Sequence, residues 1–315
     1  MIPVYHFLVS AAILVFMVIF WRTHHRGHRN WLALLLFVLC SVNSWPLRMV
    51  KGTVVGTTDT LREMQHYKQL SQHGADNWKI LPGTPLYDTI VIVTGESVLR
   101  DYMSVYGYPV PTTPWLNMAP GLFIDGYTSA AASTVPSLSR TLIYDYEQNP
   151  DSGNNVVALA AKAGYSTWWI SNQGKLGEHD TRISVIASDA EHTVFLKKGS
   201  FASRKTDDML LLQETERALA DTSSPKVIFL HMMGSHPNPC DRLHSWPNHY
   251  LEQYPRKVAC YLASISKLDN FLGQLDGILR RHSRHFAMLY FSDHGLSVSK
   301  RRLSTVWQIL KFLRE

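Results

Sequence analysis

The feature that most constrains the fold is a regular alternation of short apolar runs, rich in β-branched and aromatic residues, with longer helical patterns. The runs lie at residues 89–93 and 166–171 and within residues 225–236 and 285–295. Helical patterns lie between them, at residues 154–165, 207–221 and 260–282. Strands that alternate with helices of this length form a parallel sheet covered by helices on both faces. We therefore predict an α/β fold with a mainly parallel sheet sandwiched by helices.

Two apolar runs precede this pattern. Residues 4–21 form an uncharged run of the length that crosses a bilayer core, roughly 18–20 residues. Residues 31–46 form a second, shorter run, and three arginines lie between the two, as in loops that stay in the cytoplasm. We expect a membrane anchor with two transmembrane helices over residues 1–47, and then a linker over residues 48–86. The alternative is a signal peptide followed by a core helix, but no positive segment precedes the first run and no small-residue cleavage site follows it.

The overall charge is positive, with a net charge of +6 and a pI near 9.1. No stripe of Lys and Arg interleaves with aromatic residues, so we expect no nucleic-acid partner. Basic residues beside a membrane suit anionic lipid headgroups. We favour the simpler interpretation that many of these charges belong to juxtamembrane and tail segments.

Three cysteines are present, at positions 40, 240 and 260. Cys40 lies in the second apolar run. Cys240 and Cys260 lie after the predicted membrane anchor, on either side of a polar loop that contains prolines. An even pair in an oxidising compartment predicts a disulfide that closes this loop.

Polar side chains follow four of the apolar runs. The segments that follow them are Gly95-Glu96-Ser97, Ser171-Asn172-Gln173, Gly234-Ser235-His236 and Ser292-Asp293-His294-Gly295. Ligand sites in open α/β sheets gather at the carboxyl ends of the strands. Two carboxylates and an imidazole, those of Glu96, Asp293 and His294, suit Zn²⁺, with Mn²⁺ possible as the alternative. The sequence therefore predicts a metal site at this edge of the sheet.

A candidate nucleophile lies between the first two runs. Thr134 precedes Val-Pro-Ser-Leu, which reads as the first turn of a helix, because Pro is favoured there. A hydroxyl at a helix N-terminus faces free N–H groups and the positive end of the helix dipole, which favours an alkoxide and a phosphorylated intermediate. Ser133 is the competing nucleophile, and an ordinary helix cap is the structural alternative.

The chain resembles the phosphoethanolamine transferases of Gram-negative inner membranes, which belong to the alkaline phosphatase/sulfatase superfamily. The resemblance rests on "VIVTGESVLRDYMSVYGYPVPTTPWL", the Ser/Thr loop, "AGYSTWWISNQGKLGEHDT", "HMMGSHP" and "YFSDHG", in this order. It covers about residues 85–297. Among the branches of the family, the chain most resembles the one that decorates osmoregulated periplasmic glucans. It implies a periplasmic, sulfatase-like catalytic domain, which we place at residues 87–298.

The resemblance also implies roles for individual residues. The zinc of the family is held by the Glu of GES, the nucleophilic Thr, and the Asp and His of SDHG. These ligands match Glu96, Thr134, Asp293 and His294. The His that contacts the phosphoryl group matches His236, as a second catalytic residue.

Further positions match the family less closely. Asn172, Gln173 and Lys175 lie where the family places additional substrate contacts, and the sequence leaves their register open. Cys240 and Cys260 match a cysteine pair of the glucan branch.

The implied reaction is a two-step transfer at the inner membrane, with the catalytic domain in the periplasm. The Thr134 alkoxide attacks the phosphodiester of phosphatidylethanolamine, diacylglycerol leaves, and a hydroxyl of a glycan or lipid A-type acceptor then takes phosphoethanolamine from the threonine. Zn²⁺ activates the nucleophile and neutralises charge on the phosphoryl oxygens.

Two differences from the family lead us to expect a shortened copy. The membrane domain of the family has about five spans, against two here. Residues 299–315 form an atypical tail whose apolar spacing suits an amphipathic helix, and the further metal-site His of the family is missing after His294. Three interpretations stay open: a phosphoethanolamine transferase, a metal-dependent phosphodiesterase or sulfatase-like hydrolase, and an inactive truncated remnant. The lack of a C-x-P-S-R motif counts against a sulfatase.

Overall fold

The structure is a computed structural model of the whole chain. It describes residues 83–149, 153–176, 180–197, 206–223, 225–298 and 303–306, the stretches 67–72 and 74–81, and scattered earlier positions. Apart from Val15 and Val18, the apolar runs 4–21 and 31–46 lie outside the described residues, so the predicted membrane helices stay a prediction. Within the part that is described, no helix combines the length and the apolar character needed to cross a bilayer. The chain divides into two compact units, Met1–Gln65 and His66–Glu315, and the second unit contains the α/β domain.

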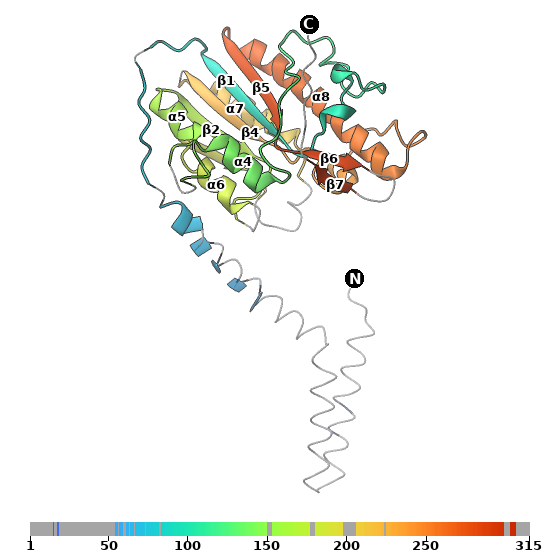
Figure 1. Cartoon of the computed structure of the whole chain (residues 1–315), viewed down its shortest axis with the longest axis horizontal. Coiled ribbons are helices and arrows are strands. Elements are labelled where there is room, and N and C mark those ends of the chain that lie inside the picture. Colours follow the sequence, from blue (N-terminus) through green and yellow to red (C-terminus); the bar gives the residue numbers. More distant parts are fainter. Residues whose placement is uncertain are drawn as a thin grey trace. The chain divides into compact units, whose positions relative to one another are not determined.

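The core of the second unit is a five-stranded, fully parallel sheet with the strand order β3-β2-β4-β1-β5 (Figure 1). The strands are β1 Thr89–Gly95, β2 Ser166–Ser171, β3 His192–Phe195, β4 Lys226–His231 and β5 Phe286–Ser292. The helices are α4 Thr134–Leu142, α5 Val156–Lys162, α6 Thr181–Ala187, α7 Leu210–Ala220 and α8 Arg256–His282. Short 3-10 turns lie at Arg100–Tyr102, Ser104–Tyr106 and Pro239–Arg242. A two-stranded antiparallel sheet, β6 Gly295–Val298 with β7 Leu303–Val306, follows β5.

The sheet is covered on both faces because successive side chains of each strand point to opposite sides. In β1, Val91 and Val93 belong to a cluster with α7 and α8. Ile90 and Ile92 pack in a second cluster, with α4, α5 and α6. A strand that is apolar on both faces reads as a continuous hydrophobic run, which is why residues 89–93 identify a central strand.

The predicted α/β architecture with a mainly parallel sheet is confirmed, with four of its strands near their predicted positions. The sequence analysis missed β3 and α6, which are short elements of four and seven residues with little periodic signal. It also predicted helical structure in the tail, whereas Leu303–Val306 forms strand β7 against β6. These four residues form a strand because they pair with β6, and this pairing outweighs the helical spacing of the apolar residues in the tail. The remainder of the tail lies outside the described residues.

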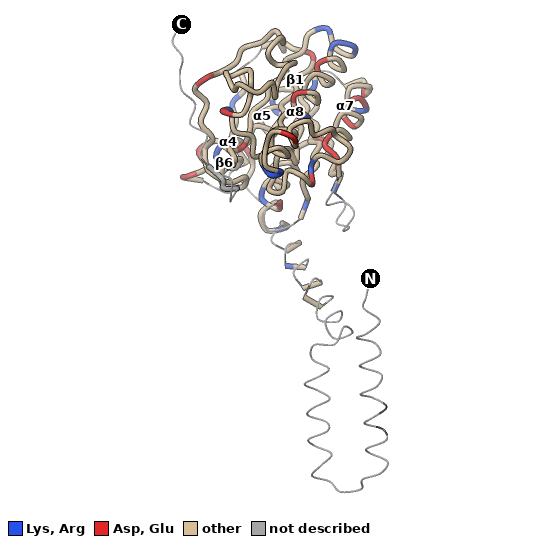
Figure 2. The backbone as a smooth tube through the Cα atoms, turned by 90° about the vertical axis from the view of Figure 1, so that its right-hand side faces the viewer, with Lys and Arg blue, Asp and Glu red and all other residues tan. Residues whose placement is uncertain are grey.

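Helix α8 is the main support of the sheet face that it covers. Its buried side includes Tyr261, Phe271 and Leu272, and its outward side carries ion pairs such as Arg280 with Asp276, 2.7 Å apart. Charged positions of both signs are spread along α7 and α8 (Figure 2). The helix therefore buries one apolar stripe while its opposite side stays solvated.

The segment between the predicted membrane anchor and β1 contacts the α/β domain. Asp76 pairs with Lys162 of α5, and the Asn77 N–H donates to Asn154 Oδ1 at 2.8 Å. Described positions between 54 and 70 are helical, whereas residues 74–81 contain no helix or strand. The boundaries at residues 47, 86 and 298 stay predictions.

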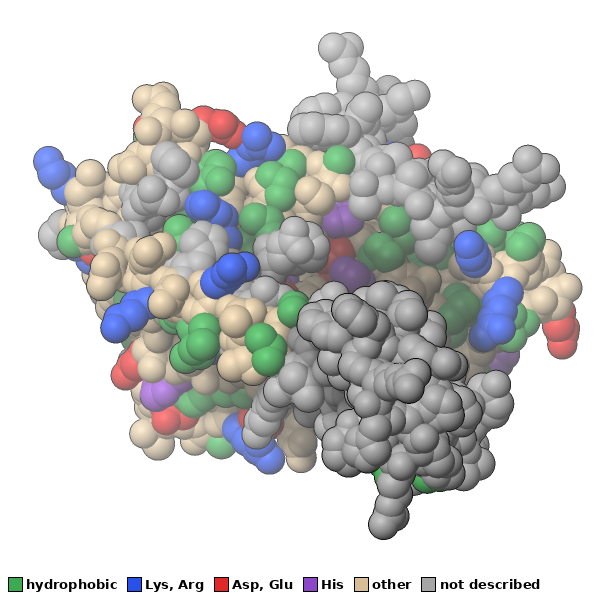
Figure 3. Space-filling model, turned by 90° about the horizontal axis from the view of Figure 1, so that it is seen from below, with side chains coloured by type: hydrophobic (Ala, Val, Ile, Leu, Met, Phe, Trp, Pro, Cys, Tyr) green, Lys and Arg blue, Asp and Glu red, His purple; other side chains and the backbone are tan. Residues whose placement is uncertain are grey.

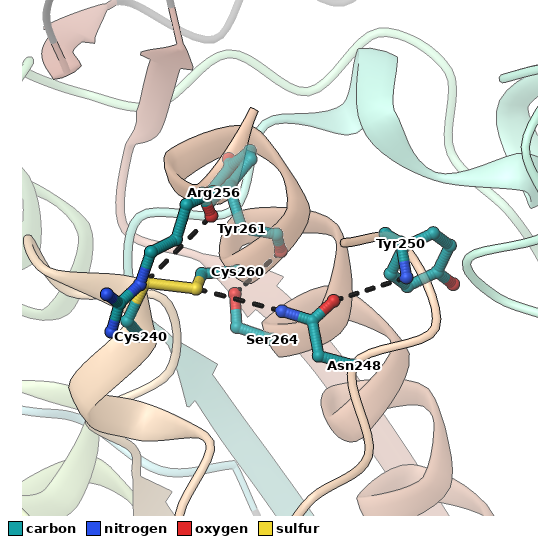
Figure 4. The surroundings of a disulfide bond; sticks show 7 residues. All are labelled: Cys240, Asn248, Tyr250, Arg256, Cys260, Tyr261 and Ser264. Carbon is teal, nitrogen blue, oxygen red and sulfur yellow. Dashed lines mark hydrogen bonds between the residues drawn. A yellow bond between two sulfur atoms is a disulfide. The ribbon is translucent and has the colours of Figure 1, made fainter. Parts of the chain in front are cut away.

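The predicted disulfide is present and joins Cys240, in the 3-10 turn after β4, to Cys260 of α8 (Figure 4). Asn248 Nδ2 donates to Cys260 Sγ at 3.7 Å, and its Oδ1 accepts from the Tyr250 N–H. Trp246 and Tyr250 pack against the small cluster formed by Leu243, Cys260 and Ala263. The disulfide therefore anchors a long polar loop to the helix that supports the sheet.

We expect a Cys240→Ser/Cys260→Ser double variant to lose about 3 kcal/mol of unfolding free energy, because the crosslink removes conformational entropy from the unfolded chain. The bond closes a loop with a sequence separation of 20 residues. Chemical denaturation with and without reductant measures the loss. Reductant should destabilise the wild type and leave the double variant unchanged; equal stability of both proteins under oxidising conditions would contradict the prediction.

Candidate active site

The carboxyl ends of the adjacent strands β1 and β5 bring three of the predicted metal ligands together. Glu96 follows β1, and Asp293 and His294 follow β5; all three are at most 2% exposed. One potential ligand atom from each lies within 4.8 Å of the others. Figure 3 shows histidine and acidic side chains set back in a hollow on the face viewed from below. The strand order therefore explains how residues almost 200 positions apart converge.

The cluster is completed by Thr134, the first residue of α4. Its Oγ1 donates to Glu96 Oε2 at 2.8 Å and lies 3.4 Å from His294 Nε2. His294 Nε2 lies 3.3 Å from Glu96 Oε1 and 3.5 Å from Asp293 Oδ2. Ser133, the competing candidate, is exposed and caps no N–H of the helix. The structure thus places the hydroxyl of Thr134 at the cluster.

The surrounding hydrogen bonds leave the inward-facing atoms of the cluster open. Asp293 Oδ1 accepts from the N–H groups of Ser97 at 3.1 Å and His294 at 2.7 Å, whereas its buried Oδ2 accepts no hydrogen bond. His294 Nδ1 lies 3.1 Å from the Gly295 carbonyl, to which it donates, so Nε2 carries the lone pair whenever the imidazole is neutral. One nitrogen and the oxygens of two carboxylates and a hydroxyl are a donor set that suits Zn²⁺, and an orphaned buried carboxylate oxygen is what a cation would satisfy. The residues present therefore fit a divalent metal.

The charges of the cluster depend strongly on one another. Burial opposes ionisation of Glu96, but the hydrogen bond and charge of His294 lower its pKa to about 2. Burial likewise disfavours a charged His294, but Glu96 and Asp293 raise its pKa to about 9. Burial, together with the charge of Glu96, raises the pKa of Asp293. In the absence of metal a proton on His294 thus balances the carboxylates, and a divalent cation would take over that role.

A second hydroxyl residue of the segment Thr134-Val-Pro-Ser137 holds the helix of Thr134 in place. Ser137 lies one turn further along α4, is fully buried, and its Oγ donates to the main-chain carbonyl of Asp293. This bond joins the helix that carries the hydroxyl to the loop that carries two of the ligands. This structural role of Ser137 was not predicted from the sequence.

Two histidines of the β4 segment differ in environment. His231 is 4% exposed within the sheet, and burial lowers its pKa to about 4, so it is a neutral packing residue. His236 lies beyond the strand end and is partly exposed. Burial also lowers the pKa of His236, Glu96 opposes this shift, and Arg242 contributes to it. His236 is therefore neutral at pH 7 and within electrostatic reach of Glu96.

The three predicted substrate contacts lie in different surroundings. Asn172 and Gln173 are buried, and their amide nitrogens donate to protein atoms: Asn172 to Thr206 O and Asp208 Oδ1, Gln173 to Met232 O. Lys175 is exposed, with Nζ 5.4 Å from the centroid of the Tyr67 ring. None of these contacts joins the three side chains to the Glu96 cluster, so their role in substrate binding stays a prediction.

Supporting residues were missed because their partners are distant in sequence. Tyr261 of α8 donates to Ser97 O at 2.9 Å and accepts from the Leu99 N–H, which fixes the turn after Glu96. Asp208 precedes α7 and accepts hydrogen bonds from the N–H groups of Met233 and Gly234. Both residues belong to the loop that leads to His236. A tyrosine on a helical face and an acid before a helix are ordinary sequence features, so no local signal identifies either role.

Comparison with known proteins finds one matching family model and several similar chains. Residues 88–308 match the sulfatase family model. Phosphoethanolamine transferase OpgE of Escherichia coli is 38% identical over 256 residues, which cover 81% of this chain and 48% of that protein. A putative phosphoethanolamine transferase of Haemophilus influenzae is 37% identical over 313 residues, which cover 94% of this chain and 64% of that protein. The chain thus spans about half to two thirds of the length of these relatives.

Solved structures support the fold. The C-terminal periplasmic domain of EcEptC from Escherichia coli superposes with a TM-score of 0.64 at 23% identity, covering 74% of this chain and 71% of that structure. A second crystal structure of that domain, a complex with Zn, gives a TM-score of 0.62 over the same shares. At this identity the likeness establishes the fold alone.

We expect the zinc affinity of the chain to rise by about tenfold per pH unit between pH 7 and 9, because zinc must displace the proton that His294 retains below its raised pKa. Above about pH 9 the zinc affinity should stop rising through this effect, since His294 is then already neutral when zinc binds. Calorimetric titration in buffers of different ionisation enthalpy measures both affinity and proton release. His285→Gln, at an exposed histidine before β5, is the matched control and should keep the slope. An affinity that does not change over this range would contradict the prediction.

Proposed function

This chain belongs to the sulfatase family, and from that premise we propose that it transfers phosphoethanolamine from phosphatidylethanolamine to a hydroxyl of a glycan or lipid A-type acceptor. The observation that carries the proposal is the position of Thr134, whose Oγ1 lies within hydrogen-bonding distance of both Glu96 and His294. A hydroxyl at a helix N-terminus beside a divalent-metal donor set is the arrangement for covalent phosphoryl transfer. Relatives named phosphoethanolamine transferases support the choice of group.

The first half-reaction would form a covalent intermediate on Thr134. Its oxygen attacks the phosphorus, a bond from phosphorus to Thr134 Oγ1 forms, and the bond to the diacylglycerol oxygen breaks. The proton that Thr134 loses is balanced by the proton that the diacylglycerol oxygen gains. Glu96 Oε2, which accepts the Thr134 hydrogen bond, orients the attacking oxygen.

The second half-reaction would reverse these bond changes with a different alcohol. An acceptor hydroxyl attacks the phosphorus and loses its proton, and Thr134 recovers its own. His236, in the loop beyond the end of β4, would bind a phosphoryl oxygen, or take up the proton of the acceptor hydroxyl and donate it to the leaving oxygen.

Glu96, Thr134, Asp293 and His294 would hold zinc, with manganese as the alternative. When bound, the metal supplies Lewis-acid charge that lowers the pKa of the hydroxyl and neutralises the phosphoryl oxygens. The Zn complex of the EcEptC domain supports zinc. The open Asp293 Oδ2 supports a cation of either kind.

The location proposed for this reaction is the inner membrane, with the catalytic domain in the periplasm. Two observations support it: the apolar runs 4–21 and 31–46, and the disulfide between Cys240 and Cys260. Structural disulfides persist in oxidising compartments such as the bacterial periplasm. A membrane anchor would hold the site beside its lipid donor.

The test is transfer from labelled phosphatidylethanolamine by the full chain in detergent, with zinc present. We expect a phosphoethanolamine adduct on Thr134 in intact-protein mass spectra, and a loss of at least about 10³-fold in rate for Thr134→Val, which keeps the side-chain shape but removes the nucleophile. Thr141→Val is the matched control. Thr141 Oγ1 donates to Ser137 O of the same helix at 2.8 Å, away from the cluster, and this variant should keep its activity.

Three outcomes would contradict the proposal in different ways. Release of phosphoethanolamine to water with no transfer to an alcohol acceptor would indicate a hydrolase. An adduct that persists in Thr134→Val would identify another nucleophile. Absence of any adduct in a folded, zinc-loaded wild-type chain would indicate a protein that has the family fold without its activity.

A further inference from the structure

The loop that follows β4, residues 232–236, carries His236 and leaves the sheet edge with every backbone N–H paired. Three of these groups donate to backbone carbonyls: Met232 to Thr94, Ser235 to Glu96 and His236 to Met233. The other two, those of Met233 and Gly234, donate to one carboxylate, that of Asp208. Burying an unpaired N–H group costs free energy. Asp208 avoids this cost by accepting hydrogen bonds from the two N–H groups of the loop that do not donate to a backbone carbonyl.

The contacts of Asp208 are short and use both of its oxygens. Oδ1 accepts from Met233 N at 2.8 Å, and Oδ2 accepts from Gly234 N at 2.8 Å. Asn172 Nδ2, from the end of β2, donates to Oδ1 at 2.8 Å and to the Thr206 carbonyl at 3.0 Å. Hydrogen bonds to an ionised acceptor are among the stronger ones in proteins. Burial raises the pKa of Asp208, and these donors oppose that shift.

On its other side the same loop contacts the backbone of Glu96, one of the predicted metal ligands. Gly234 has a φ of +48°, and a Cβ there would lie 2.7 Å from the Glu96 carbonyl oxygen. Ser235 N donates to that oxygen at 2.9 Å, and Ser235 Oγ lies 2.7 Å from Ser264 Oγ of α8. The loop is thus held between Asp208 and the backbone of Glu96, with no room for a side chain at its tightest point. A shift of the loop would displace His236 relative to Glu96.

We propose that Asp208 is a positioning residue for the transfer reaction: by binding two successive N–H groups, it fixes the loop that carries His236 against Glu96. The inference rests on the proposed function, since His236 acts on the phosphoryl group in that reaction. Within the described part of the chain, Asp208 accepts hydrogen bonds from Met233, Gly234 and Asn172 rather than from the Glu96 cluster. Asn172, predicted as a substrate contact, belongs to the same support through its amide nitrogen.

The adjacent acid provides a matched control. Asp207 Oδ1 accepts from the Met209 N–H at 3.0 Å and pairs with Lys267 Nζ at 2.6 Å. It therefore stabilises the start of α7 and its packing on α8 without a bond to the loop. Asp207→Asn and Asp208→Asn make the same chemical change one residue apart, and only the second places an amide N–H against the N–H groups of Met233 or Gly234.

The experiment compares both variants in the full chain, alone and combined with His236→Ala. We expect Asp208→Asn to lower kcat by about 10- to 100-fold, with bound zinc and KM changed less than the rate. Asp207→Asn should lower the thermal midpoint yet keep kcat. In the His236→Ala background, Asp208→Asn should cause little further loss, because the group that it positions is gone.

A second measurement does not depend on activity. Amide hydrogen exchange of Met233 and Gly234 should accelerate by at least about tenfold in Asp208→Asn, while Asp207→Asn keeps these amides protected. Equal rates for the two variants, or a full additional loss from Asp208→Asn in the His236→Ala background, would overturn the inference. If the wild type transfers no phosphoethanolamine, the proposed function fails, and exchange alone decides: protected loop amides in Asp208→Asn overturn the positioning role, and selective loss of protection supports it.

Discussion

The parallel pairing of β1 with β4 on one side and β5 on the other is the constraint on which the site depends. The register aligns Thr94 with both His231 and Phe291, so the three strands end at the same level. Polar site residues follow β1 and β5 directly, and they follow β4 after Met232 and Met233. Because parallel strands share one carboxyl edge, this pairing brings Glu96 and Asp293 together and directs the loop of His236 to the same edge.

The site at this edge of the sheet contains ionisable side chains whose burial costs free energy. Glu96, Asp293 and His294 are almost inaccessible to solvent, and buried charges are tolerated only when they are paired or bind metal. Main-chain N–H groups satisfy one oxygen of Asp293 and leave the other open. The domain therefore maintains a cluster that is electrostatically incomplete without a proton on His294 or a cation, which is the property expected of a catalytic metal site.

Helices at the two faces of the sheet fix the loops at its carboxyl edge. Ser137 of α4 binds the Asp293 carbonyl, and Tyr261 of α8 binds the turn after Glu96. Asp208, before α7, binds the loop of His236. Each loop of the candidate site thus has a polar anchor on or beside a different helix, so the geometry of the site depends on packing outside it.

The sequence by itself determined the parallel α/β architecture, four of the five sheet strands and the strand-end positions of the site residues, since a buried strand must be apolar and its functional residues must follow it. It also indicated the disulfide, because the apolar runs predicted an oxidising compartment. It did not determine β3, α6 or β7, whose short segments take their conformation from neighbouring elements. Only the tertiary structure decided that Thr134 rather than Ser133 reaches the cluster, that Asn172 binds Asp208, and that Lys175 lies on the surface. These outcomes depend on contacts between segments distant in the chain, and no local pattern of residues encodes such contacts.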